Sequence, residues 1–520
     1  MHLILIPILI LIAILPTLHT TLRTLSLRRI PGPFLTRLTK LWYFNRVRTG
    51  HFETDNIALH RRYGPVVRIA PDHYSISGRA AIKTVYGTGS KFTKSSWYEG
   101  WKHPDPNRWT LFPDRDVKRH AETRKRFSSL YSMTSLVHYE AFVDRCTDLF
   151  CMRLREFAAG GEEFNLGHCF QCYAFDVIGD ITYGQRFGES ACALLGYLLA
   201  GWLTLGGFLD RGEDIEGTIA ALQRLMTYST LVGIYPEWHP RLFGPLSRFS
   251  WSGAAGREYI MRFVREKIRG LSVKAGLGQV ERGPLETQSF VEKMILARDK
   301  DPEKVTDYHV FMMGLSNVIA GSDTTAISLS AIMYYLLRYP EVMEKLRREI
   351  DVFTAQGKCS DRVTFRESQE MPYFQAVIKE ALRMHSATGL PLWRVVPDGG
   401  AEINGYFFPA GTVVGINTWV AHYDEEVFPD ATTFRPERWI EAESNPEKLK
   451  AMNEMYMPFG LGTRTCLGKH ISILEMSKLI PRIVRDFDFS MEHENWETEN
   501  SWFVKPTNFS VRVRERPVAR

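Results

Sequence analysis

The chain has 520 residues and a formal net charge of +6, from 65 basic and 59 acidic residues. This near balance argues against nucleic acid as a partner, although it permits a local basic face. Hydrophobic residues make up 44% of the chain and aromatic residues 12%, enough for a large core and an internal cavity. No repeat or low-complexity tract divides residues 36–520, so we expect a single large domain there.

The beginning of the chain is almost purely aliphatic. Residues 2–22 read HLILIPILILIAILPTLHTTL, and Arg23, Arg28 and Arg29 follow. An apolar span of roughly 20 residues crosses a bilayer, and cationic residues prefer its cytosolic side. The sequence therefore predicts an N-terminal transmembrane helix over residues 1–22, a membrane anchor that leaves the rest of the chain in the cytosol. A cleaved secretory signal is the alternative, but its charges would precede the apolar run.

Residues 23–35 are basic and proline-rich, and the segment IPGP within them predicts a stiff hinge.

A cytosolic domain keeps its thiols reduced, and the odd count of seven cysteines agrees with this. Cys169 and Cys172 form a CxxC pair without a second pair at zinc-site spacing. The pair lies in a run with the pattern of a buried helix, so core packing explains it.

Helical patterns dominate the remaining chain, and the strand signals are short. In chain order, the patterns predict a strand near 64–71, helices over 116–132, 168–184, 307–339 and 373–386, strands within 401–417 and a helix over 467–484. Pro340 ends the third of these helices, and Asn404–Gly405 predicts a hairpin turn. No strand leads into a GxGxxG or phosphate-binding loop. The predicted fold class is mainly α with small β-sheets.

The segment FGLGTRTCLG surrounds Cys466. The helix predicted after it places the sulfur near a helix N-terminus, where the dipole and free N–H groups favour a thiolate. Gly460, Gly462 and Gly468 allow backbone to approach a flat group, and Arg464 offers a fork that suits a carboxylate. Haem combines an iron, a flat face and two propionates. A buried free cysteine at a helix start is the alternative.

The segment AGSDTT interrupts a long apolar helix with Asp323 and Thr324. A threonine hydroxyl can bond to the carbonyl four residues back and open the helix locally, and Gly321 leaves room beside it. A buried carboxylate also requires partners or water. The pattern predicts a polar notch in an apolar wall, where protons could be delivered. A kink stabilised by threonines is the alternative.

These residues carry a family resemblance. Phe459, Gly462, Arg464, Cys466 and Gly468 match the haem-binding loop of the cytochrome P-450 family of haem-thiolate monooxygenases. The chain resembles this family over about residues 30–515. Within the family, the fungal pisatin-demethylase-like group has sequences similar to the segments ALRMHSATGLPLWRVVPDGG and GINTWVAHYDEEVFPDATTFRPERW. The resemblance implies the cytochrome P-450 fold and a haem b cofactor with Cys466 as axial ligand of its iron.

The resemblance also implies roles for other charged residues. Asp323 and Thr324 match the family's acid–alcohol pair, for which proton relay is the implied role. Glu380, Arg383 and Arg438 match a buried structural triad that locks the region of the cysteine loop. His120, Arg124 and Arg394 match positions that hold the haem propionates, although many members have tryptophan where His120 stands. Exposed helix charges and a strand-edge residue are the alternatives.

The implied activity is insertion of one atom of O2 into an apolar small molecule, with electrons from NADPH. NADPH–cytochrome P-450 reductase is the implied partner, with cytochrome b5 as an optional second donor, at the endoplasmic reticulum membrane. The basic residues Lys118, Arg119, Lys125 and Arg126 suit docking of an acidic flavoprotein, with a solvated helix face as the alternative. The expected pocket walls are the aromatic stretch Trp97–Trp109, residues 194–208, the notch helix and Leu390–Val396, with core packing as the alternative for each.

Several other functions stay open from the sequence. The substrate would belong to fungal secondary metabolism, with a detoxifying, phytoalexin demethylase-like monooxygenase as an alternative. A haem-thiolate isomerase or dehydratase would need no reductase, and a membrane-bound haem or gas sensor would bind ligand without turnover. A cysteine-nucleophile hydrolase would need a base, for which His470 is the nearest histidine in sequence.

Overall fold

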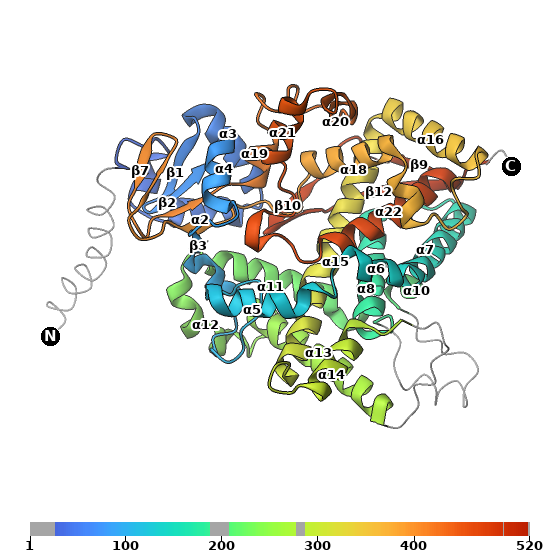
Figure 1. Cartoon of the computed structure of the whole chain (residues 1–520), viewed down its shortest axis with the longest axis horizontal. Coiled ribbons are helices and arrows are strands. Elements are labelled where there is room, and N and C mark those ends of the chain that lie inside the picture. Colours follow the sequence, from blue (N-terminus) through green and yellow to red (C-terminus); the bar gives the residue numbers. More distant parts are fainter. Residues whose placement is uncertain (1–26, 188–206, 277–286, 492, 518–520) are drawn as a thin grey trace.

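The fold comes from a computed structural model, which describes residues 27–187, 207–276, 287–491 and 493–517. One group of strands lies at the left end of the molecule in Figure 1, where β1, β2 and β7 are beside α3 and α4, while β9 and β12 lie at the other end near α22. The largest sheet has the strand order β1-β2-β8-β5-β3, and only β2 and β8 run parallel within it. Its strands are β1 (Val66–Ala70), β2 (His73–Ile76), β3 (Thr93–Lys94), β5 (Arg394–Val395) and β8 (Val413–Gly415).

Three smaller antiparallel sheets have the orders β4-β12-β9, β10-β11 and β6-β7. Their strands are β4 (Phe164–Asn165), β6 (Ala401–Ile403), β7 (Tyr406–Phe408), β9 (Phe487–Met491), β10 (Thr498–Ser501), β11 (Phe503–Pro506) and β12 (Ser510–Glu515). The C-terminal strands thus close sheets with segments far away in sequence.

Helices make up most of the described chain. The α-helices are α2 (Leu41–Arg48), α3 (Phe52–Tyr63), α4 (Arg79–Tyr86), α5 (Val117–Ser128), α6 (Met133–Leu136), α7 (Glu140–Gly160), α8 (Leu166–Tyr183), α10 (Phe208–Arg211), α11 (Thr218–Val232), α12 (His239–Leu246), α13 (Gly253–Gly276), α14 (Phe290–Lys300), α15 (Asp307–Arg338), α16 (Pro340–Ala355), α17 (Phe365–Gln369), α18 (Pro372–Met384), α19 (Thr418–His422), α20 (Glu437–Ala442), α21 (Pro446–Met455) and α22 (Lys469–Asp486). The 3-10 helices are η2 (Phe34–Arg37), η3 (Ser96–Trp101), η4 (Val137–Tyr139), η5 (Ile215–Gly217), η6 (Pro236–Trp238) and η7 (Gly462–Arg464).

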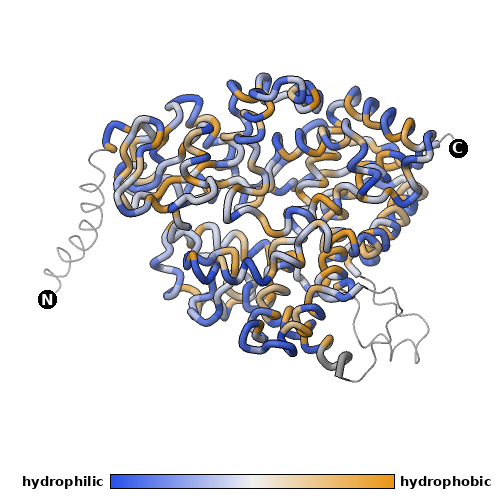
Figure 2. The backbone as a smooth tube through the Cα atoms, in the orientation of Figure 1, coloured by the Kyte–Doolittle hydropathy of each residue, from blue (hydrophilic) through white to orange (hydrophobic). Residues whose placement is uncertain are grey.

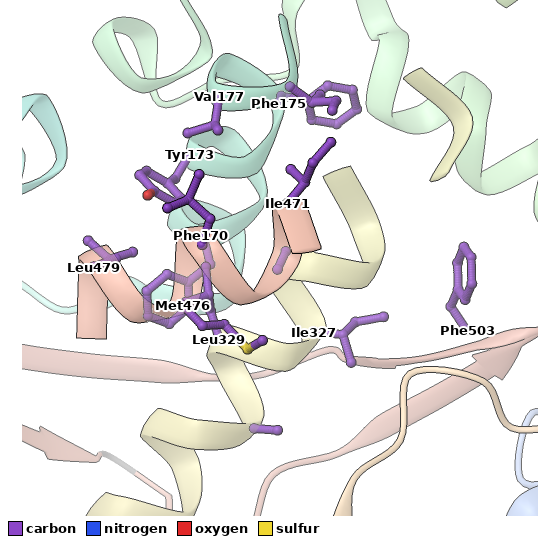
Figure 3. Packing of buried hydrophobic residues seen from close by; sticks show 14 of the residues in the cluster. Phe170, Tyr173, Phe175, Val177, Ile327, Leu329, Ile471, Met476, Leu479 and Phe503 are labelled. Carbon is purple, nitrogen blue, oxygen red and sulfur yellow. The ribbon is translucent and has the colours of Figure 1, made fainter. Parts of the chain in front are cut away.

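The central helix is α15, which contacts α8, α14, α18 and α22. Figure 3 shows side chains of α8, α15 and α22 pointing toward one another, with Phe503 of β11 nearby. The labelled residues of this cluster on the three helices are Phe170, Tyr173, Phe175, Val177, Ile327, Leu329, Ile471, Met476 and Leu479. Because α22 directly follows the cysteine loop, this packing fixes the loop against the core.

A peripheral helix, α16, buries only one of its faces, unlike the central helix α15. Figure 2 shows hydrophilic and hydrophobic segments alternating along α16, as expected for a helix that buries one face. The buried face of α16 consists of Val342, Met343, Leu346 and Ile350. By contrast, α15 is buried on nearly every side, which explains why its sequence is apolar almost throughout.

The predicted fold class, mainly helical with small sheets, is confirmed. The helix predicted over 116–132 is α5, and the Asp116 carboxylate accepts a hydrogen bond from the Arg119 N–H at its start. Pro340 begins α16, directly after α15. The Asn404–Gly405 turn joins β6 to β7 with φ of +50° and +76°, the left-handed values that a tight hairpin needs.

The predicted anchor over residues 1–22 lies outside the described residues. In the part of the chain that the structure describes, no helix is long and apolar enough to cross a membrane. Residues 27–33 of the predicted hinge lie against β1, where the Arg68 N–H donates to the Pro31 carbonyl at 2.8 Å. The division into anchor, hinge and catalytic domain stays a prediction.

Candidate active site

A cavity of about 330 Å³ lies between the cysteine loop, α5, α15 and the large sheet. Cys466 is on its surface, together with Phe459, Gly460 and Gly468 of the same loop. Thr324 of α15 and Arg394 of β5 also line it, so segments separated by more than a hundred residues converge here. The cavity brings together the predicted cysteine ligand and the four residues expected to contact a haem carboxylate, which are His120, Arg124, Arg394 and Arg464.

The cysteine loop is closed by its own backbone. The Cys466 N–H donates to the Phe459 carbonyl at 2.7 Å, and α22 begins at Lys469, two residues after the predicted start, so the sulfur lies near a helix N-terminus as predicted. The Cys466 side chain is open to the cavity, yet the surrounding protein desolvates it and raises the pKa of its thiol. The backbone N–H groups of Gly468 and Lys469 and the charge of Arg124 oppose this rise without cancelling it.

This balance corrects one expectation. The helix start alone does not make Cys466 a thiolate, because burial disfavours the charged form more than the nearby N–H groups favour it. A metal cation reverses this, since a coordinating thiol is deprotonated outright. The sulfur is therefore suited to a bound iron, and the thiol by itself is a weak nucleophile.

The three loop glycines serve different purposes. Gly460 and Gly462 have φ of +67° and +62°, which residues with a side chain rarely adopt. A Cβ on Gly462 would lie 2.1 Å from the Tyr86 carbonyl oxygen, so this glycine admits the backbone of α4 and does not line the cavity. Gly468 has φ of −79°, and a Cβ there would lie 4.0 Å from the Cys466 sulfur, so neither its backbone nor its protein neighbours require glycine.

Cationic side chains crowd the cavity beside the cysteine loop. Arg464 donates to the Asp114 carbonyl at 2.9 Å, Arg124 to the Thr465 carbonyl at 2.8 Å and Arg394 to the Trp393 carbonyl at 3.0 Å. Their acceptors are backbone carbonyls, and none of these arginines forms an ion pair with a carboxylate of a described residue. Their charges therefore remain available to an anion in the cavity.

Two further basic residues, His120 and Lys94, lie beside this cluster of arginines, the cation cluster. Burial and the neighbouring Arg464 lower the pKa of His120 to about 3, so its imidazole is neutral. Burial and Arg394 hold the pKa of Lys94 well below its usual range, while its ammonium donates to the Phe112 carbonyl. Sequence reasoning missed Lys94 because no motif surrounds it. The pairing of β3 with β5 brings it beside Arg394.

The cation cluster fits the propionates of haem. Burial, and repulsion from Arg394, lower the pKa of Arg464 to about 10, which an anion bound among these groups would relieve. With the Cys466 sulfur on one wall and unpaired cations on another, the described residues suit an iron and two propionates, two of the three features of haem. The roles of His120, Arg124, Arg394 and Arg464 toward propionates stay predictions.

The polar notch of α15 is present, with its two residues facing different ways. The Thr324 hydroxyl donates to the Ala320 carbonyl at 2.8 Å, as predicted, and Thr324 lines the cavity. Asp323 is buried on another side, where it accepts from Gln171 at 2.5 Å and lies 2.7 Å from the Lys505 ammonium. The helix continues unbroken through this segment, so the predicted local opening is wrong.

The predicted triad is fully buried. Arg383 and Arg438 both contact the Glu380 carboxylate at 2.8 Å. The Trp439 indole N–H donates to the same carboxylate at 2.9 Å, a contact that the sequence pattern did not reveal. Glu380 therefore joins α18 to α20 through two side chains of α20, Arg438 and Trp439.

His422 connects this triad to the cysteine loop. Its Nδ1 lies 2.9 Å from the Arg383 carbonyl, and its Nε2 lies 2.9 Å from the Met457 backbone nitrogen, two residues before Phe459. Burial and Arg383 lower the pKa of His422 to about 3, so the ring is neutral. A neutral ring with its proton on Nδ1 satisfies both contacts, donating to one and accepting from the other.

The other predicted features have varied outcomes. On α5, Lys118 and Lys125 are exposed, whereas Arg119 pairs with Asp114 at 2.7 Å, which leaves fewer cations for docking.

Of the predicted pocket walls, Trp97 belongs to the core, and the cavity wall includes Trp101, Leu392 and Trp502. Residues 194–206, the apolar stretch expected to form a pocket wall, lie outside the described residues.

The alternative sites gain no support. Cys172 is buried in α8, and its sulfur lies 3.6 Å from the His168 ring, consistent with core packing. Across residues 27–187, 207–276, 287–491 and 493–517, no group of three metal-ligating side chains forms a site. The Nδ1 of His470 is buried without a hydrogen-bond partner among the described residues, so nothing orients it as a base.

Alanine at position 462 tests the loop geometry. Gly462→Ala should lower the free energy of unfolding by more than the roughly 1–2 kcal/mol that a left-handed φ costs a residue with Cβ, because the added methyl also meets the Tyr86 carbonyl. Gly460→Ala is the matched control, since its Cβ would have no neighbour closer than 3.9 Å. Urea unfolding measures both, and equal losses would contradict the close approach at Gly462.

His422→Phe tests the link between the triad and the loop. The substitution keeps a ring but leaves the Arg383 carbonyl and the Met457 N–H buried and unpaired, at a cost of about 1–3 kcal/mol for each group. His385→Phe is the control, because the His385 ring contacts a single backbone group, the Val504 carbonyl. Thermal unfolding should show the larger loss for His422→Phe. A smaller or equal loss would argue against the link.

Comparisons with known proteins agree with this geometry. A family model described as Cytochrome P-450 matches residues 31–512. A pisatin demethylase of Fusarium vanettenii is 37% identical over 485 residues, covering 92% of this chain and 87% of that protein. Cytochrome P-450 monooxygenases of Emericella nidulans and Penicillium aethiopicum are each 34% identical, covering 95% of this chain and 94% and 95% of those proteins. The chain belongs to the cytochrome P-450 family and is a haem-thiolate monooxygenase.

Proposed function

We propose that the chain inserts one atom of O2 into a small, largely apolar molecule, using haem b held by Cys466 and electrons that a reductase draws from NADPH. The observation that carries this proposal is the Cys466 sulfur at the surface of a cavity whose walls are apolar on one side and cationic on the other. Leu225, Met226 and Trp502 supply apolar surface away from the cysteine loop. The pocket is thus suited to orienting an apolar substrate.

Haem would be held by residues already positioned for it. Cys466 would be the axial ligand, and Arg124, Arg394, Arg464 and Lys94 would hold the propionates, with His120 adding an N–H donor. When bound, haem supplies the activation of O2. The protein's own tasks are to orient the substrate, to limit water and to deliver protons.

Proton delivery is proposed for Thr324 and Asp323. The Thr324 hydroxyl lies at the cavity wall and can also hydrogen-bond to a water there. Asp323 lies behind it, 2.7 Å from Lys505, whose side chain is 18% exposed. A proton could enter by way of Lys505 and Asp323, so the two polar residues of the notch would act in sequence.

The biological setting is also proposed. The similarity to fungal monooxygenases supports a substrate from fungal secondary metabolism, and the relative named pisatin demethylase supports detoxification of a plant defence compound as the second candidate. The aliphatic residues 1–22 support a single-pass anchor in the endoplasmic reticulum membrane, with the catalytic domain in the cytosol. NADPH–cytochrome P-450 reductase would then meet the domain at the membrane, with cytochrome b5 as a second donor.

The reduced carbon monoxide difference spectrum tests sulfur ligation. Cys466→Ala should abolish the signal of the sulfur-ligated haem, since it removes the ligand. Cys359→Ala should keep the signal, because Cys359 is a free cysteine between α16 and α17 and does not line the cavity. Persistence of the signal in Cys466→Ala would refute the assignment.

Wild-type protein with reductase should also consume NADPH, whereas an isomerase or dehydratase would consume none.

A hydroxyl-specific pair of variants tests proton delivery. Thr324→Val keeps the shape of the side chain and removes its hydroxyl, whereas Thr324→Ser keeps the hydroxyl. Positioned proton transfer contributes on the order of a hundredfold to rate, so Thr324→Val should lose up to about that much of the product rate. Thr324→Ser should stay close to wild type. Equal product formation by wild type and Thr324→Val would rule out a role for this hydroxyl.

A further inference from the structure

A single arginine, Arg257, stands apart from the cation cluster on the same cavity. It belongs to α13, which packs closely on α11. A Cβ on Gly253 would lie 2.2 Å from the Arg224 carbonyl oxygen, and one on Gly256 would lie 2.6 Å from the Ala221 carbonyl oxygen. These two contacts fix the first turns of α13, so the backbone that carries Arg257 is held in place.

The guanidinium of Arg257 is buried and poorly satisfied. The residue is 4% exposed, and its Nη2 donates to the Ser229 hydroxyl at 3.3 Å. Its Nε is buried without an acceptor, and no carboxylate within the described ranges forms an ion pair with it. The adjacent Glu258 is instead engaged by His103 at 3.0 Å and by Arg108 at 3.7 Å.

The charge of Arg257 persists despite its burial. Burial lowers its pKa to about 10, which still leaves the guanidinium protonated at neutral pH. A buried charge without a partner is costly, and its cost falls when a counter-ion enters the site. Asn317, an uncharged polar residue of the same wall, is already satisfied, since it bonds to Tyr131 at 2.5 Å and to Thr182 at 2.8 Å.

A second unsatisfied donor lies against the same turn of α11. The Trp101 indole N–H is buried without an acceptor in the described chain, and Trp101 lines the cavity. The preceding residue, Gly100, packs so closely that a Cβ there would lie 2.6 Å from the carbonyl oxygen of Ser229. Ser229 also accepts the hydrogen bond from Arg257. The segment that carries Trp101 and the side chain of Arg257 therefore both contact Ser229 of α11.

The surface around these donors is aromatic. Trp101 packs on Trp502 with ring centroids 5.8 Å apart, and Phe503 follows on β11. Flat apolar walls beside a guanidinium match an aromatic ring that carries an acidic group, since the rings supply apolar contact and arginine binds a carboxylate with two parallel hydrogen bonds.

We propose that Arg257 binds a carboxylate of the substrate, with Trp101 as a second donor, so that the preferred substrates are aromatic acids. The inference rests on the proposed function, because it assumes that the cavity beside Cys466 is the substrate site. It narrows that function from apolar molecules in general to those with one anionic group. Arg257 would be a binding residue that sets which end of the substrate faces away from the cation cluster.

Calorimetric titration of the full-length holoenzyme tests this preference with naphthalene-2-carboxylate and its neutral primary amide. Hydrogen bonds to a charged group contribute about 1.5–3 kcal/mol, so wild type should bind the acid about 10- to 100-fold more tightly than the amide. Arg257→Gln should remove the preference while leaving amide binding unchanged, and Arg257→Lys should keep part of it. Arg262→Gln is the matched control, an exposed arginine on the same helix, and should keep the preference in full.

Equal binding of acid and amide to wild type would overturn the inference, as would a preference that survives Arg257→Gln. The comparison within wild type does not depend on the folding of any variant. The carbon monoxide spectrum of each sample separates the two claims. A normal spectrum without carboxylate preference refutes the role of Arg257 alone, whereas carboxylate preference without sulfur-ligated haem refutes the proposed function alone.

Discussion

One buried carboxylate, Glu380, begins a chain of hydrogen bonds that reaches the start of the cysteine loop. It receives hydrogen bonds from Arg383, Arg438 and Trp439, which hold α18 and α20 together in the core. From Arg383 the connection passes through the neutral ring of His422 to the Met457 N–H, and the loop begins two residues later. Because removal of one member of such a buried network leaves the others uncompensated, at about 3–5 kcal/mol, the loop has little freedom to move.

The cavity has one apolar wall and one cationic wall, and the two differ in their effect on stability. Its apolar wall gains stability from burial, whereas its cationic wall holds charges that the described protein does not neutralise. Arg464 and Arg124 donate to backbone carbonyls, and Lys94 is held by the Phe112 carbonyl beside two aromatic rings. A site of this kind is costly when its anion is absent, which is consistent with a cofactor that contributes to the stability of the fold.

The sequence predicted what depends on local chemistry. Particular residue types at fixed spacing define the loop around Cys466, the bond from Thr324 to Ala320 and the turn at Asn404. These features could therefore be predicted from the sequence. Lys94, His422 and Arg257 carry no such pattern, because their roles arise from segments that only the tertiary fold brings together. Asp323 combines both cases. Its place in the polar segment of α15 was predicted from local sequence, but its partners were not. Gln171 lies 152 residues earlier in the chain, and Lys505 lies on β11.

The central claim is that sulfur from Cys466 binds the haem iron, and X-ray absorption at the iron edge of the purified protein tests it most directly. The account predicts a sulfur atom in the iron coordination shell of wild type and of Cys359→Ala, and its loss in Cys466→Ala. Iron surrounded by nitrogen and oxygen alone in the wild-type protein, or sulfur that remains in Cys466→Ala, would contradict the account.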